Sequence, residues 1–406
     1  MPDSTFLSRV RIKNYRSIGS CDLSLGPLTF LVGPNGSGKS NFLDALRFVA
    51  DSLRDSLDHA IRERGGIGEV RRRSTGHPNN FAVRLDFSLQ TREGRQEGHY
   101  SFLIGSRPSG GFEVLSEECA VAGTHPAYYF VRKGELVRHG GMEGTPPPAS
   151  ADRLYLPLAS GWPVLRPVFE GLSRMGFYNL NPDRIRDLQS PDASALLRRD
   201  GSNLASILSA LTRRAPERKT RIEEYLSRVV PGVEKVEVKG MGSKETIEFR
   251  QRVKGAEFPW HFDAANMSDG TLRALGVLVS LFQFSNGDGP EVRLVGIEEP
   301  ETALHPAAAG LLLDALLEAS ERIQVIVTSH SPDLLDSKEL PADSILVVVG
   351  SEGESQIARV DQAGRDALKE GLCTPGELLR LDQLTPDPDA IEAGEKQTKF
   401  MFDYTG

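Results

Sequence analysis

Three short runs of apolar residues, bounded by glycine, proline or charged residues, set the main pattern of the chain. They occupy residues 28–32, 292–297 and 325–329, and runs of this length between turn signals predict buried strands. Apolar residues at helical spacing follow the first run at 41–48, and a mostly apolar helix is predicted after residue 271. Buried strands that alternate with such helices predict an α/β fold with a parallel or mixed central sheet.

The pattern changes to an alternation of apolar and polar residues between residues 81 and 139. Strict alternation is typical of strands with one buried face, so we expect an antiparallel β-layer inserted after the first helix. Lys133 and Gly134 stand between two of these strands and predict a hairpin turn. A flexible link rich in glycine and proline follows at 140–151.

Composition and charge narrow the class of protein. Of the 406 residues, 39% are hydrophobic and 26% are charged, as expected of a soluble protein with a sizeable core. No stretch is long and apolar enough for a membrane span, and the N-terminus lacks the apolar segment of a signal peptide. Three widely spaced cysteines indicate reduced thiols in a cytoplasmic protein. A net charge of −8 argues against a surface that is basic all over, but a local basic face remains compatible with it.

The segment between the first strand and the first helix fits the phosphate-binding pattern G-x-x-x-x-G-K-[ST]. Its glycines let backbone N–H groups close around phosphate oxygens, and the helix N-terminus adds a partial positive charge. We expect Lys39 to bind the β- and γ-phosphates of ATP and the Ser40 hydroxyl to bind Mg²⁺. The residues predicted to bind the nucleotide are Gly33, Pro34, Asn35, Gly36, Ser37, Gly38, Lys39, Ser40 and Asn41.

Two carboxylates, Glu298 and Glu299, follow the second apolar run. At the carboxyl end of a strand beside the phosphate-loop strand, Glu298 can hold Mg²⁺ directly or through water. Glu299 would face the γ-phosphate one residue further on, where it can orient and deprotonate the attacking water. We therefore predict that Ser40 and Glu298 are the metal ligands and that Glu299 is the catalytic base.

Two further groups occupy the start of a helix and the end of a strand. Ser268, Asp269, Gly270 and Thr271 begin the apolar helix, where Ser268 is a good N-cap and Gly270 leaves the first turn open. A second helix start that offers N–H groups to phosphate is redundant within one subunit. It is explained if it closes over the nucleotide of a neighbouring subunit. His330 ends the third apolar run, where an imidazole can hydrogen-bond the γ-phosphate.

The order of these motifs resembles that of the ABC-type ATPases of the RecF/SMC group, and the chain looks most like their compact RecF-like members without a long coiled coil. The resemblance covers residue 6 to about residue 349. It implies a P-loop NTPase with ABC-type head architecture, a mixed or parallel central sheet, an inserted antiparallel β-layer and a helical lobe. It also implies these roles: a signature motif at 268–271 acting in trans, a Walker B acid at Glu298, a catalytic acid at Glu299, a D-loop at 302–306 and a switch histidine at His330. The predicted catalytic residues are Lys39, Glu299 and His330.

Three features depart from the family pattern. The signature reads Ser-Asp-Gly-Thr instead of the Ser-Gly-Gly of transporters, and the Walker B acid is glutamate instead of aspartate. The Q-loop glutamine is not identifiable, since Gln90 and Gln189 are both weak candidates. The coupling between the lobes is therefore left open.

We expect four segments along the chain. They are an ATP-binding lobe with the β insertion at 1–150, a helical lobe at 151–232, the signature, Walker B and switch-histidine half of the core at 233–350, and a C-terminal extension at 351–406. From Pro386 the extension is acidic and poor in core residues, so we expect it to be frayed.

The resemblance implies a homodimer that buries two ATP molecules with Mg²⁺ at its seam, hydrolyses them and acts on DNA in repair or genome maintenance. An unidentified protein is a further expected partner, and a membrane is not. Basic residues between 198 and 221 either form a solvated helical face or contact DNA. The alternatives are an ATPase of an anti-phage defence system, a transporter subunit, a monomeric P-loop kinase or binding module, and a nuclease. The roughly 75 residues after His330 are expected to be too few for a nuclease domain.

Overall fold

The computed structural model describes residues 4–74, 78–91, 94–193, 196–283 and 292–403. The chain forms two compact units, and each is described by itself. The P-loop unit comprises residues 5–175, 341–372 and 381–406, and the signature unit comprises residues 1–4, 176–340 and 373–380. The four segments expected from the sequence were defined by their predicted roles, whereas these two units are defined by how the chain packs. The four segments stay a prediction.

The P-loop unit contains the N-terminal strands and the C-terminal helices. Its strands are β1 (Leu7–Tyr15), β2 (Ile18–Ser24), β3 (Leu28–Val32), β4 (Asn80–Thr91), β5 (Gly94–Ser106), β6 (Phe112–Val121), β7 (Ala127–Arg132), β8 (Glu135–Gly140), β15 (Ile345–Ser351) and β16 (Glu354–Arg359). Its helices are α1 (Lys39–Arg54), α2 (Leu57–Glu63), α3 (Ile67–Val70), α4 (Leu156–Ala159), α5 (Arg166–Ser173), α11 (Gln362–Lys369), α13 (Pro388–Asp403) and the 3₁₀ helix η3 (Ala342–Ser344).

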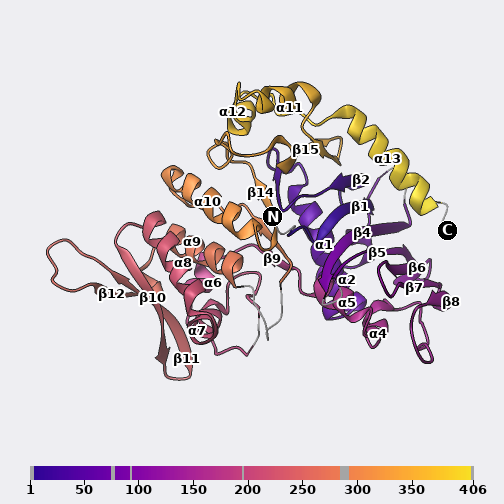
Figure 1. Cartoon of the computed structure of the whole chain (residues 1–406), viewed down its shortest axis with the longest axis horizontal. Helices are drawn as coiled ribbons and strands as arrows, with labels where there is room; N and C mark the ends of the chain where they lie inside the picture. Colours follow the sequence, from indigo (N-terminus) through magenta and orange to yellow (C-terminus); the bar gives the residue numbers. More distant parts are fainter. Residues whose placement is uncertain (1–3, 75–77, 92–93, 194–195, 284–291, 404–406) are drawn as a thin grey trace. The chain divides into compact units, whose positions relative to one another are not determined.

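The sheet of this unit joins an antiparallel layer to the strand that precedes the phosphate loop (Figure 1). Its strands follow the order β8-β7-β6-β5-β4-β1-β2-β16-β15-β3. Neighbours from β8 to β2 are antiparallel, whereas β3 pairs in parallel with β15. The turn between β7 and β8 is formed by Lys133 and Gly134, which both have positive φ, as the predicted two-residue hairpin requires. The expected mixed sheet with an inserted antiparallel layer is confirmed.

Aromatic side chains form the core between α1 and this sheet. Phe48 of α1 lies edge-on to Phe81 of β4, with ring centroids 5.4 Å apart, and it also packs against Tyr15 of β1 and Phe102 of β5. All four rings are fully buried. Because such rings bury a large apolar area and prefer edge-to-face contacts, they fix α1, and with it the end of the phosphate loop, on the sheet.

The acidic C-terminal segment is helical, so the expectation that it is frayed was wrong. Helix α13 lies along β2 and β1 (Figure 1). Thr398 is fully buried and donates a hydrogen bond to the Cys21 carbonyl at 3.3 Å, and Phe402 packs against Ala82 and Leu103. The buried face of α13 includes glycine and threonine at four-residue spacing, which an apolar pattern does not reveal.

The signature unit contains a small parallel sheet, a separate three-stranded sheet and a group of helices. Its strands are β9 (Gly176–Tyr178), β10 (Val233–Met241), β11 (Lys244–Gln251), β12 (Trp260–Asp263), β13 (Leu294–Glu298) and β14 (Gln324–Ser329). Its helices are α6 (Pro182–Arg186), α7 (Leu204–Arg214), α8 (Pro216–Val229), α9 (Asp269–Phe282), α10 (Ala309–Ser320), α12 (Pro375–Arg380) and the 3₁₀ helices η1 (Ala264–Asn266) and η2 (Pro306–Ala308).

In this unit β13 pairs in parallel with β14 on one side and with β9 on the other. The whole of β14, and β13 up to its last residue, is buried, as expected for parallel strands covered on both faces. Helix α9 is buried over residues 271–282 and packs against α8 and α10 (Figure 1). Buried residues therefore occur in every turn of α9, from Thr271 in the first turn to Phe282 in the last.

Candidate functional site

The phosphate loop connects β3 to α1, in the predicted order of strand, loop and helix. Gly36 and Gly38 have φ values of 79° and 104°, in the left-handed region that favours glycine. An added Cβ would lie 1.9 Å from Ser355 Oγ at Gly38, and 2.0 Å from the Val348 carbonyl oxygen at Gly33. Glycine is therefore required at Gly36 by the backbone conformation, at Gly33 by the close packing on β15, and at Gly38 by both the conformation and the packing on β16.

Lys39 begins α1 and curls back over the loop. Its side chain is buried, and its Nζ donates hydrogen bonds to the carbonyl oxygens of Gly33 at 2.8 Å and of Pro34 at 2.9 Å. Ser40, the next residue, is exposed. The ammonium group is thus held against the loop backbone, and the hydroxyl predicted to bind Mg²⁺ is accessible.

A chain of side-chain hydrogen bonds supports the loop from segments that are distant in sequence. Ser355 of β16 donates to the Ser37 carbonyl at 2.6 Å and lies 2.7 Å from the Ser17 hydroxyl. Asn41 of α1 donates to the same Ser17 hydroxyl at 2.6 Å. The sequence interpretation missed Ser355, because no local pattern relates it to a motif more than 300 residues earlier.

An ionic network fixes α1 from behind. Asp44 lies 3.1 Å from Arg64, 2.7 Å from Arg47 and 3.0 Å from Arg16, and it accepts a hydrogen bond from the Tyr15 hydroxyl at 2.7 Å. Burial alone would raise the pKa of Asp44, but the three guanidinium groups hold it below its usual value. Burial beside the Asp44 carboxylate raises the pKa of Tyr15 well above its usual value, so the phenol stays protonated.

The first predicted acid, Glu298, ends β13 and forms an ion pair. Arg199 Nη2 lies 2.7 Å from Glu298 Oε1. The backbone of Arg199 is fixed at this place because its carbonyl accepts a hydrogen bond from Asn179 N, 3.0 Å away, just after β9. One oxygen of the carboxylate predicted to hold Mg²⁺ is therefore paired with a side chain of the same unit.

The second predicted acid, Glu299, has a φ of 44°, which is uncommon for a residue with a Cβ. Its N–H donates to both the carbonyl and the hydroxyl oxygen of Thr328, at 3.0 and 3.2 Å. Its Oε1 lies 3.4 Å from Nδ1 of His330, and both side chains are partly exposed. The predicted catalytic acid and switch histidine thus lie together at the ends of β13 and β14, while their roles stay predictions.

The predicted signature motif caps α9. Ser268 Oγ accepts a hydrogen bond from Thr271 N at 3.2 Å, as an N-cap does. An added Cβ at Gly270 would lie 2.5 Å from the carbonyl oxygen of Ala303, which itself has a φ of 66°. Glycine is required here because the helix start packs directly on the backbone of the predicted D-loop.

The aspartate that distinguishes this signature is paired with a cation. Asp269 forms an ion pair with Arg186 of α6, which also lies 2.6 Å from Asp183. The hydrogen bond to Asp269 raises the pKa of Arg186. The negative charge in the first turn is thus compensated, and it also interacts favourably with the positive end of the helix.

Glu301 is a third acid at this place that the sequence interpretation left without a role. Its Oε1 accepts a hydrogen bond from Ser329 Oγ at 2.6 Å, which ties the start of the D-loop to the end of β14. Burial raises the pKa of Glu301. The closeness of Glu301 to Glu298 and Glu299 in the sequence could have indicated that it lies at the same site.

Neither glutamine considered for the Q-loop stands out as a nucleotide ligand. Gln189 is 4% exposed, donates to the carbonyls of Ile185 and Gly201, and accepts from Ala205 N at 2.8 Å, so it stabilises the segment between α6 and α7. Gln90 is exposed on β4, opposite Arg95.

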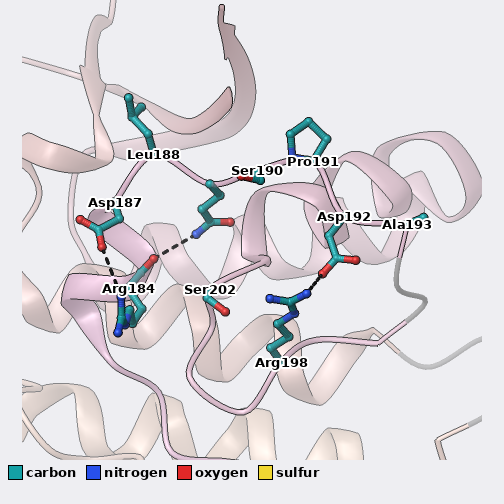
Figure 2. A pocket seen from close by; sticks show the side chains of 10 residues that line it. Arg184, Asp187, Leu188, Ser190, Pro191, Asp192, Ala193, Arg198 and Ser202 are labelled. Atoms are coloured by element: carbon teal, nitrogen blue, oxygen red, sulfur yellow. Dashed lines mark hydrogen bonds and ion pairs between the residues drawn. The ribbon is translucent and has the colours of Figure 1, made fainter. Parts of the chain in front are cut away.

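Gln189 also lines a polar pocket of about 330 Å³ in the same segment. Figure 2 shows two ion pairs on its rim, Arg184 with Asp187 and Asp192 with Arg198. Arg184 and Arg198 are therefore both paired with carboxylates of the same segment.

The basic residues between 198 and 221 are mostly engaged within the protein. Their ion pairs are Arg198 with Asp192, Arg199 with Glu298, Lys219 with Glu223, and Arg221 with Glu318 and Glu224. Arg218 is buried, and burial lowers its pKa. Arg213 and Arg214 are exposed at the end of α7. The DNA-contact interpretation therefore depends on these last two.

The oxygen donors of Ser40 and Glu298 fit Mg²⁺, which uses few protein ligands and completes its shell with phosphate and water. Over the ranges that the structure describes, no group of three or more His, Cys, Asp or Glu residues could hold a metal ion. Among the same residues, no helix has the length and apolar character needed to cross a membrane.

Relatives of known name match parts of the chain. The OLD nuclease of Thermus scotoductus is 47% identical over 51 residues, 13% of this chain and 10% of that protein. The DNA replication and repair protein RecF of Magnetococcus marinus is 31% identical over 143 residues, 33% of this chain and 34% of that protein. The Old nuclease of Escherichia phage P2 is 23% identical over 381 residues, 86% of this chain and 60% of that protein. The chain thus covers less than two thirds of the length of each of these relatives.

Solved structures of Smc heads share the fold. The SmcHead bound to the C-winged helix domain of ScpA has a TM-score of 0.55 and 16% identity, over 88% of this chain and 99% of that one. The Smc head of Pyrococcus furiosus with an extended coiled coil has a TM-score of 0.55 and 13% identity, over 90% and 99%. The expected ABC-type head architecture is therefore confirmed.

One protein-family model matches residues 28–102 and 158–336, more than half of the chain, and it carries the description "AAA domain, putative AbiEii toxin, Type IV TA system". Its first segment begins at the strand before the phosphate loop, and its second contains the predicted signature, both predicted acids and the predicted switch histidine. The chain belongs to this family of AAA domains, and it shares its fold with the Smc heads and part of its sequence with the RecF proteins, as the motif order predicts.

Proposed function

We propose that the protein binds ATP with Mg²⁺ at the phosphate loop and hydrolyses it in a homodimer, in which residues 268–271 of each subunit cover the nucleotide of the other. The observation that carries the proposal is the conformation of the loop. Gly36 and Gly38 adopt positive φ, and the Lys39 ammonium is held against the loop carbonyls. A loop of this kind at a helix N-terminus binds phosphate through its N–H groups.

The proposed roles follow from the groups available. Ser40 and Glu298 would hold Mg²⁺, which neutralises phosphate charge when bound. Glu299 accepts a proton from the attacking water, and His330, 3.4 Å from it, hydrogen-bonds the γ-phosphate. Arg199 pairs with Oε1 of Glu298, so it would have to release this oxygen before the oxygen could bind the metal.

We also propose that Asn179 supplies the side-chain amide for which no Q-loop glutamine was found. Strand β9 runs parallel to β13 with Tyr178 opposite Ile297, so the next residues on the two strands are Asn179 and Glu298. Asn179 is exposed at this strand end. Its amide can orient water or a metal-bound ligand beside the acid.

We propose that opening and closing of the dimer acts on DNA, in repair or genome maintenance. The similarity to proteins named DNA replication and repair protein RecF supports this reading. Defence against phage is the second candidate, supported by the similarity to Old nuclease of Escherichia phage P2 and by the toxin–antitoxin description of the family. Nuclease activity is not proposed for this chain, because it covers 60% of that relative.

The test combines two variants with one control. Glu299→Gln should retain ATP binding, lose turnover and accumulate as a dimer with ATP and Mg²⁺ in size-exclusion chromatography with light scattering. Lys39→Ala should lose ATP binding, and Glu321→Gln, an exposed acid of the same unit, should behave as wild type. A Glu299→Gln protein that stays monomeric at saturating ATP would contradict the shared site.

The ATPase rate with single-stranded, double-stranded and gapped DNA then decides the biological reading. Stimulation by one of these forms supports action on DNA. A rate that none of them changes would favour the defence candidate, in which another protein or signal controls turnover.

A further inference from the structure

Arg273, in the second turn of α9, is a buried arginine to which the sequence interpretation gave no role. It is 9% exposed. Its Nη1 donates to the Leu180 carbonyl at 2.9 Å, and its Nη2 donates to the carbonyls of Glu298 at 3.2 Å and Glu299 at 3.0 Å. Within the residues that the structure describes, its guanidinium bonds only to main-chain carbonyls and to no carboxylate. Burial of a cation without a carboxylate partner costs desolvation free energy.

The two carbonyls that share Nη2 lie on either side of the backbone dihedrals of Glu299. Because one donor binds both, it restrains their relative direction, which φ and ψ of Glu299 together determine. The residue has a φ of 44°, a conformation that a side chain with a Cβ rarely adopts without support. Thr328 holds the N–H of Glu299 on one side, and Arg273 holds its carbonyl on the other.

Helix α9 touches the loop after the acids at a second point. Gly270 packs on the carbonyl of Ala303, while Arg273, three residues further on, reaches Glu298 and Glu299. The first turn of α9 carries the proposed trans-acting residues 268–271, and the helix behind it is buried throughout. A shift or rotation of this first turn therefore moves both contacts together.

We propose that Arg273 is a positioning residue, through which α9 sets the backbone conformation and the aim of Glu299. This inference rests on the proposed function. When the partner's nucleotide binds the start of α9, the contact through Arg273 brings Glu299 of the same chain into its working direction. Two sites at opposite faces of the dimer seam are then coupled by one side chain.

The test compares Arg273→Met, which removes every donor, with Arg273→Lys, which keeps the charge and a donor group. Arg273→Met should lower kcat by about 100-fold, the size of effect of misplacing a general base, while KM for ATP changes by less than about threefold. Arg273→Lys should recover at least about tenfold of that loss. ATP-dependent dimer formation should persist in both variants.

Arg218→Met is the matched control, because Arg218 is also a buried arginine of the signature unit and pairs with Glu217 of its own helix, 3.9 Å away. It should leave kcat within about threefold of wild type. Equal losses of kcat in the Arg218 and Arg273 variants, with equal falls in melting temperature, would show a structural role and overturn the proposal.

A double-variant cycle shows whether Arg273 acts through Glu299. In the Glu299→Gln background, Arg273→Met or Arg273→Lys should change the residual rate by less than about threefold, because the group being positioned is already absent. Additive losses would overturn the inference. If wild type has no ATPase activity, or if Glu299→Gln turns over normally, it is the proposed function that fails. If Arg273→Met does not fold, the same cycle with Arg273→Lys decides.

Discussion

Removal of Arg64 should weaken the helix that carries the phosphate loop more than any exposed substitution on it. The side chain of Arg64 is 1% exposed, and its Nη2 lies 3.1 Å from Asp44 and 2.9 Å from Asp51. Arg64→Met fills a similar volume but removes a buried counter-ion from two buried carboxylates. Breaking a buried pair in this way costs about 3–5 kcal/mol. Arg47 and Arg16 still face Asp44, so we expect a value near the lower end, about 3 kcal/mol.

The effect should depend on pH in a defined direction. The pKa of Asp44 in the folded protein lies below its usual value, so its stabilising contribution is complete above an unfolded pKa of about 3.9. That contribution is lost as the pH falls through the lower folded value. In Arg64→Met, burial is opposed by fewer cations, so the carboxylate takes up a proton at higher pH. The free energy of unfolding of the variant should therefore come closer to that of wild type as the pH is lowered from 7 to 5.

Urea unfolding followed by circular dichroism at both pH values measures these differences. Arg54→Met is the matched control, because Arg54 pairs with Asp51 at 2.6 Å but is half exposed. We expect it to cost less than about 1 kcal/mol. An Arg64→Met protein that is no less stable than Arg54→Met, or a difference that is independent of pH, would refute the assignment of this network as a buried support of α1.

Three further predictions concern the nucleotide, the metal and DNA. Gly38→Ala should weaken ATP binding, measured by calorimetry, by more than about tenfold, because φ is 104° at this position and the added methyl group would overlap Ser355. An unchanged affinity for ATP would mean that the loop adapts freely. Arg199→Gln should lower the Mg²⁺ concentration needed for half-maximal binding of ATP, because Glu298 loses its ion pair with Arg199. A higher Mg²⁺ concentration for half-maximal binding would show that Arg199 orients the acid instead of competing with the metal. Charge reversal at Arg213 and Arg214 together should weaken DNA binding and make its salt dependence shallower by about 1–2 in log–log slope, and an identical isotherm would remove both residues from the DNA hypothesis.

The elements nearest the motifs were predictable because their signals are local. Apolar runs identified β3, β13 and β14, and the glycine pattern placed the loop directly before α1. The hydroxyl of Ser268 and the glycine at position 270 likewise predicted the start of α9 from local residues. In each case a strand, a turn or a cap is decided by residues within one or two turns of each other.

What the sequence could not give are the contacts between distant segments. The hydrogen bond from Ser355 to the phosphate loop and the carbonyl contacts of Arg273 depend on tertiary packing, and no periodicity encodes them. Arg199 was interpreted as part of a basic cluster, although its partner Glu298 lies 99 positions away in sequence. Helix α13 was missed because its buried face uses glycine and threonine, which resemble solvent-exposed residues in any apolar pattern.

The interrupted order of the P-loop unit has a consequence for synthesis on the ribosome. Its phosphate-loop strand, Leu28–Val32, pairs with Ile345–Ser351, a segment that is translated roughly 300 residues later. At about 5–20 residues per second, the early strand waits tens of seconds for its neighbour while the signature unit emerges between them. During that time an apolar edge is open to wrong partners, so nascent chains of this protein should depend on chaperones more than their size alone suggests.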